Sequence, residues 1–157
     1  MIMNEIKINL NDFRKFNIED KKILFPILKK FNPKLSDYSF TNLFIWSEQY
    51  GLSWINLDQK LLFYDSQRDY CTMVIGMCNK IDISIYLKIS DEMIRQGKSG
   101  NFYLIDLEIV DSCKEDFLKY FELIIDESFS DYVYDTKKLV ELKGAKLAKK
   151  KNLISQF

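Results

Sequence analysis

The spacing of apolar residues changes repeatedly along this chain, and this limits the folds that it can form. Alternating or short apolar runs predict strands over residues 6–10, 52–57, 60–64, 72–75, 102–107 and 122–126. Apolar residues three and four positions apart predict helices over residues 18–31, 39–49 and 112–121. Strands and helices interleaved in this way are typical of a mixed α/β fold, in which helices flank a mixed sheet.

Local signals define the ends of the first two predicted helices. Asn17, followed by two acidic residues, predicts a capped helix start, and Asn32-Pro33 predicts its end. Pro26 lies inside this helix and predicts a kink or a division into two pieces. The second helix begins near Asp37 or Ser39, and its apolar residues, Trp46 and Tyr50 among them, surround most of its circumference. We therefore expect that helix to be largely buried.

Two further segments concern the sheet. Asp58-Gln59 predicts a two-residue hairpin between the second and third strands. Residues 81–96 fit two structures, because their isoleucines alternate as in a strand while Ile81, Ile85, Ile89 and Met93 also fit one face of a helix. Periodicity alone does not decide between them.

Composition indicates one compact domain. A chain of 157 residues with 47% apolar and 15% aromatic residues is long and apolar enough to bury a single core. There is no signal peptide and no apolar run near the roughly 20 residues of a membrane span, which predicts a cytoplasmic protein without a membrane span. The three cysteines lack metal-type spacing and are expected to be reduced thiols that pack in the core.

The chain contains no histidine, which restricts its chemistry. Ser-His-Asp and Cys-His mechanisms are excluded within these residues. Any general base would be a carboxylate, a lysine of lowered pKa, a tyrosine, a thiolate or the substrate itself. The sequence identifies no catalytic residue, and whether the protein is an enzyme stays open.

Charge is neutral overall but unevenly distributed. Residues 101–136 hold ten acidic residues against two lysines, and residues 137–157 hold seven lysines against Glu141. The two blocks either neutralise each other or lie solvated, or else the lysines attract phosphate groups. On one helix, Lys143, Lys146 and Lys150 would form a stripe with Lys149 beside it, suited to tRNA or another phosphate-bearing ligand. The alternative is an amphipathic helix whose core-facing stripe is Leu147, Ile154 and Phe157.

The segment before the lysines is a second candidate binding site. Asp131, Tyr132 and Tyr134 combine a carboxylate with two phenols after a predicted strand, and an amino group would bind to such a set. The alternative is a turn in which Asp131 or Asp135 caps the next helix while the tyrosines pack on the core.

Two other motifs carry less chemistry. Gly97-Lys-Ser-Gly100 is expected to be a helix end and turn instead of a phosphate loop. Asp106 and Glu108 would share one face of a strand, but they lack a third ligand, and we expect no metal site. No cofactor-binding motif is evident.

Two segments resemble a known bacterial family. Ser36-Asp-Tyr-Ser-Phe-Thr-Asn-Leu-Phe-Ile-Trp46, and Asp131-Tyr-Val-Tyr-Asp135 followed by Leu139, Leu142, Gly144 and the lysines, look like signatures of proteins that share the C-terminal domain of phosphatidylglycerol lysyltransferases. That resemblance implies a tandem acetyltransferase-like (GNAT-like) fold. It also implies that residues 1–157 form a single acetyltransferase-like domain, a half-module resembling the first of two repeats. It favours a helix over residues 81–96.

The resemblance also bears on function. In the best-known relatives this domain transfers lysine from charged tRNA to phosphatidylglycerol, so acyl-CoA or aminoacyl-tRNA is the implied donor. Ala148 stands where relatives often have histidine. The first hypothesis is an aminoacyl- or acyl-transferase whose substrate contacts the residues Asp131, Tyr132, Tyr134, Lys146, Lys149 and Lys150. The alternative is a non-catalytic module that binds a protein or nucleic acid. A half-module exposes surfaces that the other repeat would cover, so a homodimer is also expected.

Overall fold

The computed structural model describes residues 8–31, 35–57, 60–74, 82–127, 130 and 135–156. The chain divides into two compact units, Met1–Ile124 and Ile125–Phe157. The prediction of a single domain over residues 1–157 stays a prediction, and the two units are described separately.

The described residues of the first unit form one five-stranded sheet, with the strands in chain order. The strands are β1 (Arg14–Lys15), β2 (Leu52–Leu57), β3 (Lys60–Asp65), β4 (Tyr70–Val74) and β5 (Asn101–Phe102). The first four pair antiparallel, whereas β4 and β5 run parallel. Leu57 pairs with Lys60, which confirms the predicted hairpin, although its turn, Asp58-Gln59, lies outside the described residues. The predicted mixed α/β class is confirmed.

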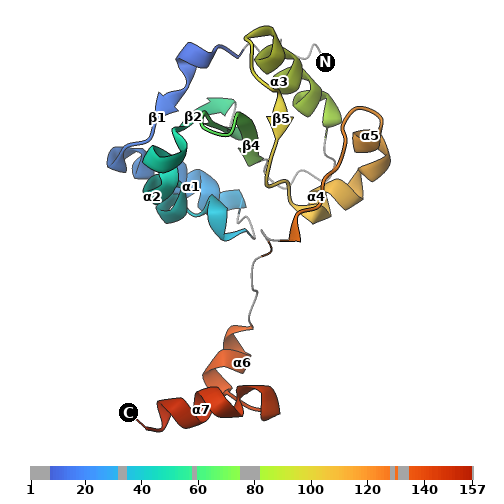
Figure 1. Ribbon diagram of the computed structural model, residues 1–157. Helices are drawn as coiled ribbons and strands as arrows, with labels where there is room; N and C mark the ends of the chain where they lie inside the picture. The colour runs from blue at the N-terminus through green and yellow to red at the C-terminus, as the bar shows by residue number, and fades with distance from the viewer. Residues whose placement is uncertain are drawn as a thin grey trace. The chain divides into compact units, whose positions relative to one another are not determined.

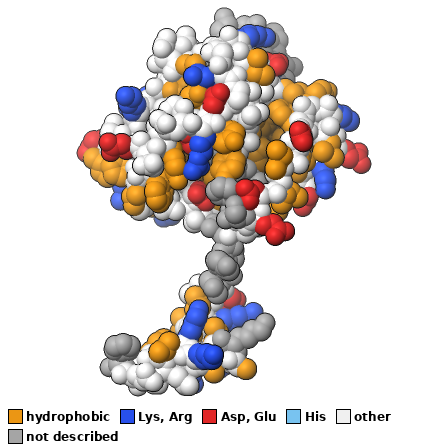
Figure 2. Space-filling model, in the orientation of Figure 1, with side chains coloured by type: hydrophobic (Ala, Val, Ile, Leu, Met, Phe, Trp, Pro, Cys, Tyr) orange, Lys and Arg blue, Asp and Glu red, His pale blue; other side chains and the backbone are white. Residues whose placement is uncertain are grey.

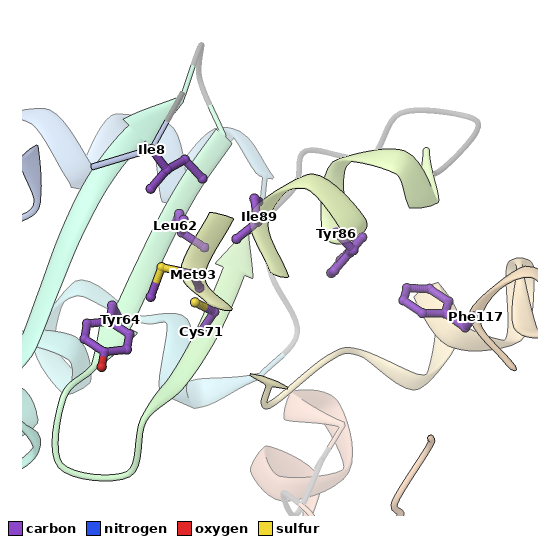
Figure 3. Close-up of a cluster of buried hydrophobic side chains, with 8 residues drawn as sticks. All are labelled: Ile8, Leu62, Tyr64, Cys71, Tyr86, Ile89, Met93 and Phe117. Carbon is purple, nitrogen blue, oxygen red and sulfur yellow. The ribbon is translucent and has the colours of Figure 1, made fainter. Parts of the chain in front are cut away.

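Strand β3 lies at the centre of two hydrophobic clusters because its side chains are buried on both faces. Leu61 and Phe63 pack with residues of α1 (Lys21–Phe31) and α2 (Phe40–Tyr50). Leu62 and Tyr64 pack with residues of α3 (Ile83–Arg95) and α5 (Lys114–Leu118). Figure 1 shows α1 and α2 on one side of the sheet and α3 on the other. Figure 3 shows the second cluster, where side chains from α3 point towards the sheet. The first unit is therefore a sheet between two helical layers.

Helix α1 starts as predicted. The Asn17 side chain accepts a hydrogen bond from the Asp20 amide (3.2 Å), and the Asp20 carboxylate accepts one from the Asn17 amide (2.8 Å). This reciprocal box caps the 3-10 turn η2 (Ile18–Asp20), from which α1 continues. The helix runs across Pro26 as a single element, so of the two predicted alternatives, a kink or two short pieces, the division does not occur. Leu24 and Leu28 are buried on either side of the proline and hold the helix to the sheet.

The Asp20 carboxylate also links the first strand to the second. It is 1% exposed and accepts a hydrogen bond from Trp54 Nε1 (3.2 Å). Arg14 lies 3.6 Å from its other oxygen and places its guanidinium 5.1 Å from the centre of the Trp54 ring. Asp20 is thus a buried charge with several partners, as buried carboxylates require.

Helix α2 is capped by the Ser39 hydroxyl, which accepts a hydrogen bond from the Asn42 amide (3.2 Å). It ends at Gly51, whose φ of 58° lies in the left-handed region. Only one of its faces packs on the sheet, where Phe40 and Leu43 are buried. Ile45 is 60% exposed and Trp46 is 48% exposed. The expectations of a largely buried helix and of a core position for Trp46 were therefore wrong.

The ambiguous segment forms helix α3, as the family resemblance indicated. Asp82 caps it by accepting a hydrogen bond from the Ser84 amide (3.0 Å), and Tyr86, Ile89 and Met93 form its buried face. At its end, the Gln96 side chain accepts a hydrogen bond from the Leu10 amide (2.9 Å) and donates one to the Ile8 carbonyl (2.7 Å). The side-chain amide of Gln96 thus both accepts from and donates to the backbone of residues 8–10, as the backbone of a neighbouring strand would.

Several predicted strands differ from the structure. Residues 8–9 are not part of a strand, and Leu10–Asp12 form the 3-10 helix η1, so the described part of the first predicted strand is wrong. The strand predicted over 102–107 is limited to β5, and α4 (Leu107–Ser112) follows it. Residues 121–126 lie outside any helix or strand, so the strand predicted there is also wrong. The helix predicted over 112–121 corresponds to the shorter α5.

The described residues of the second unit form short helices. These are α6 (Thr136–Glu141), the 3-10 helix η5 (Ala145–Leu147) and α7 (Ala148–Ile154). Leu142 has a left-handed backbone conformation (φ 46°) and Gly144 has a φ of 99°, so the helical structure is interrupted between α6 and η5. Ile154, expected in a core-facing stripe, is 64% exposed.

Candidate functional site

The lysine-rich segment is presented by the helices of the second unit. Asp135 caps α6 by accepting a hydrogen bond from the Lys138 amide (3.1 Å). This confirms the alternative interpretation in which Asp135 serves as a helix cap. The break at Leu142 and Gly144 then redirects the chain into η5 and α7. Lys143 therefore does not share a helix with Lys149 and Lys150, and the expected stripe through all of them is wrong.

Exposed basic side chains gather on this unit, beside apolar ones (Figure 2). Among its described side chains, the exposed lysines are Lys137, Lys138, Lys143, Lys149, Lys150 and Lys151. Lys143 pairs with Glu141 at 3.2 Å, and Glu141 is the one acidic residue that the sequence has after Thr136. We call Lys149, Lys150 and Lys151 of α7 the lysine triplet. The triplet thus lies in residues 137–157, which hold seven lysines and one acidic residue.

The other residues predicted to bind substrate cannot be placed together. Asp131, Tyr132 and Tyr134 lie outside the described residues, as does the side chain of Lys146. Their role in binding an amino group or a phosphate stays a prediction.

The Gly97–Gly100 segment is a helix end and turn, as predicted. The Gly97 amide donates to the Ile94 carbonyl (2.9 Å) and the Lys98 amide to the Met93 carbonyl (3.0 Å). The Ser99 amide donates to the Asp69 carboxylate (2.8 Å), and the Ser99 hydroxyl donates to the Asp69 carbonyl. These bonds use amides that a phosphate loop would direct at a ligand.

The acidic pair that was considered for metal binding lies elsewhere than expected. Asp106 caps α4 by accepting a hydrogen bond from the Glu108 amide (2.9 Å), so the two residues do not share a strand. Within the part of the chain that the structure describes, no group of three or more Cys, Asp or Glu side chains is arranged to hold a metal ion.

Buried phenols and a buried thiol are held in their neutral forms. Burial raises the pKa of the Cys71 thiol to about 12, with a smaller contribution from the Asp69 carboxylate. Burial also raises the pKa of Tyr64, to which the hydrogen bond from its hydroxyl to Asp69 (2.8 Å) adds. Burial likewise raises the pKa of Tyr38 and of Tyr86. At neutral pH these groups are protonated, so none of them is poised as a nucleophile.

Sequence reasoning missed one surface feature of the first unit. Trp46 stacks on Tyr50, with ring centroids 5.7 Å apart and an angle of 23° between the planes. The Arg68 guanidinium lies 4.0 Å from the centre of the Tyr50 ring. We call these three residues the aromatic stack. The spacing of Trp46 and Tyr50, one helical turn apart, was a usable signal for the ring pair, but Arg68 comes from the turn after β3 and could not be linked to them from sequence.

Comparison with known proteins defines the class of this chain. The family described as "Phosphatidylglycerol lysyltransferase, C-terminal" matches residues 28–157, which include the sheet from β2 onward and the lysine-rich helices. The chain belongs to this family, and it is therefore a transferase-related domain. The acetyltransferase-like fold that we expected is consistent with this membership. The chain matches no curated protein and no solved structure. None of the helices in the described residues has the length and apolar content that a membrane crossing requires.

Proposed function

We propose that this chain is a transferase-related domain that binds aminoacyl-tRNA as its donor, and that the lysine triplet contacts the RNA phosphates. The observation that carries the proposal is the exposure of Lys149, Lys150 and Lys151 on α7, in a segment with one carboxylate. Family membership supports the choice of an aminoacyl donor.

Electrostatics explains why such a segment suits RNA. An exposed lysine that neutralises a phosphate releases condensed counterions, and the affinity then falls as the salt concentration rises. Three adjacent lysines, in a segment that is rich in lysine and poor in acidic residues, give a local positive field. Binding of this kind is independent of sequence, so recognition of the aminoacyl group would need further residues. Asp131, Tyr132 and Tyr134 remain our candidates for that role.

The test is the affinity of tRNA at a series of salt concentrations, measured by fluorescence anisotropy. We expect Lys149→Glu/Lys150→Glu to weaken binding about tenfold or more at low salt and to reduce the salt slope by about two. Lys21→Glu/Lys29→Glu is the matched control, because it makes the same change in charge at exposed positions of α1. An equal loss in both variants would show only a response to net charge, and an unchanged affinity in the α7 variant would overturn the proposal.

Acyl-CoA is the other donor that we considered. A competition experiment separates the two donors, since a CoA thioester that shares the site would displace labelled tRNA. We expect no displacement by acyl-CoA at concentrations at which unlabelled tRNA competes fully.

A non-catalytic binding module is the second candidate function. It is favoured by the absence of histidine from the sequence and by the structural use of the Gly97–Gly100 amides. Transfer of a labelled amino acid from tRNA to phosphatidylglycerol vesicles distinguishes the two functions. Turnover that is lost in Lys149→Glu/Lys150→Glu would support the transferase, and binding without turnover would support the module.

A further inference from the structure

The aromatic stack of Trp46, Tyr50 and Arg68 places a half-exposed indole ring at the surface of the first unit, and no step of the proposed function uses it. We propose that it is a stacking platform for an unpaired nucleobase of single-stranded RNA. The inference takes from the proposed function only the choice of RNA as partner, because it concerns a surface of the first unit and not the lysine triplet.

The platform is held rigidly, because the turn after β3 is tied to the end of α2. The Gln67 amide donates to the Tyr50 carbonyl (3.3 Å), and the Ser66 hydroxyl donates to the Gly51 carbonyl (3.0 Å). The close approach is possible because Gly51 has no side chain, and a Cβ there would clash with the Ser66 hydroxyl.

The buried carboxylate of Asp65 shapes the same turn. It accepts hydrogen bonds from the Gln67 amide (3.0 Å) and the Arg68 amide (2.9 Å), and it lies 4.0 Å from Arg68 Nε. Arg68 is therefore positioned over Tyr50 by its own backbone as well as by its side chain. A surface arranged before the ligand arrives loses less entropy on binding.

The side chains of this surface are of the kinds that bind a nucleobase. Trp46 is 48% exposed although Tyr50 already stacks on it, so part of its ring is open to a planar ligand. Aromatic side chains stack on every base, and a neighbouring arginine adds cation–π and phosphate contacts. Of the exposed residues near the aromatic stack in sequence, Glu48, Gln49 and Gln67 are polar and Ile45 is apolar, so Trp46 lies in a mixed surface and not in a large apolar patch.

The tryptophans make a direct experiment possible. Trp54 is 2% exposed, so a ligand that reaches the surface will quench the fluorescence of Trp46 and leave that of Trp54. We expect a short oligoadenylate to quench the wild-type protein saturably. An oligomer of the same length with abasic sites in place of the bases should quench much less, because it keeps the phosphates and lacks the planar groups.

Substitutions test whether the stack itself binds. Trp46→Ala and Tyr50→Ala should weaken oligoadenylate binding about fivefold to a hundredfold by anisotropy, and Trp46→Phe should restore part of it. Phe25→Ala is the matched control, because Phe25 is also 48% exposed but lies on α1, outside the stack. Circular dichroism confirms that each variant is folded.

Three outcomes separate this inference from the proposed function. Base-dependent quenching that persists in Lys149→Glu/Lys150→Glu supports the platform even if tRNA binding by the lysines fails. Equal affinity of Trp46→Ala and wild type overturns the platform and leaves the lysine proposal standing. Equal binding of the abasic oligomer also overturns it, because only phosphates would then be recognised.

Discussion

At the scale of single residues, buried polar side chains determine which substitutions this fold tolerates. Asp20 is the clearest case, because its carboxylate accepts from Trp54 and from the Asn17 amide and faces Arg14. The sequence predicted the capping role of this region from Asn17 and its acidic neighbours. It did not predict the contact with Trp54, because a residue 34 positions away is outside the reach of any local pattern.

We expect Asp20→Ala to lower the free energy of unfolding by about 2–4 kcal/mol, because it leaves buried donors without an acceptor. Urea denaturation followed by circular dichroism measures the change. Asp12→Ala is the control, since Asp12 lies exposed on η1 and should leave the midpoint unchanged. A midpoint for Asp20→Ala equal to that of the control would contradict the assigned role.

Cys71 predicts an alkaline dependence of stability. Its folded pKa is raised to about 12, above the ordinary thiol value of about 8.5. The unfolded chain therefore loses this proton first, so the contribution of Cys71 is complete below about pH 8.5 and is lost as the pH rises towards 12. As the pH rises from about 9 to 10.5, we expect the free energy of unfolding of Cys71→Ala to fall by about 1–2 kcal/mol less than that of the wild-type protein. Urea midpoints with a reductant present measure this, and parallel losses in both proteins would rule the thiol out.

At the scale of single elements, long periodic segments were predicted well and short ones were not. The β2–β3 hairpin and helices α1, α2 and α3 were each signalled by several consecutive apolar positions, caps or turns. Helix α4 has six residues, which is less than two turns, and Asp106 and Glu108, two residues apart, resembled one face of a strand. Which residues of α2 are exposed was also beyond local patterns, because Ile45 and Trp46 are as apolar as the buried Phe40. Of the candidate site, the sequence located the lysines but not the break that separates Lys143 from α7.

The turn after α3 offers a matched pair of glycines. Both Gly97 and Gly100 have positive φ, at 76° and 69°. A Cβ on Gly100 would lie 2.8 Å from the Ser90 carbonyl oxygen, whereas nothing lies within 4 Å of one on Gly97. We expect Gly97→Ala to cost about 1 kcal/mol and Gly100→Ala about 2–3 kcal/mol of unfolding free energy. Thermal denaturation compares them, and equal losses would show that backbone strain alone matters.

At the scale of the whole molecule, the property to be measured is the oligomeric state. Large apolar side chains are exposed at the end of the first unit, including Leu118, Tyr120 and Ile124. Exposed apolar side chains that gather in one patch commonly mark a contact with another surface. The predicted homodimer stays a prediction.

Light scattering over a concentration series should give a dimer mass if these side chains are the contact. In that case Leu118→Lys/Ile124→Lys should yield a monomer, because burying two charges opposes association. Ile23→Lys/Phe25→Lys is the control, because it changes two exposed apolar residues of α1 instead. A monomeric wild-type protein at all concentrations would refute the dimer.

The side-chain amide of Gln96, which is hydrogen-bonded to the backbone of Ile8 and Leu10, also bears on the order in which the protein folds. Its two bonds join residues 86 and 88 positions apart, whereas β2, β3 and β4 pair with their sequence neighbours. Contacts between distant residues form only after the entropy of closing the intervening loop has been lost. The antiparallel strands β2, β3 and β4 should therefore pair early in folding, and residues 8–10 should pack against α3 late. In pulse-labelling hydrogen exchange, the Leu10 amide should gain protection after the amides of β3.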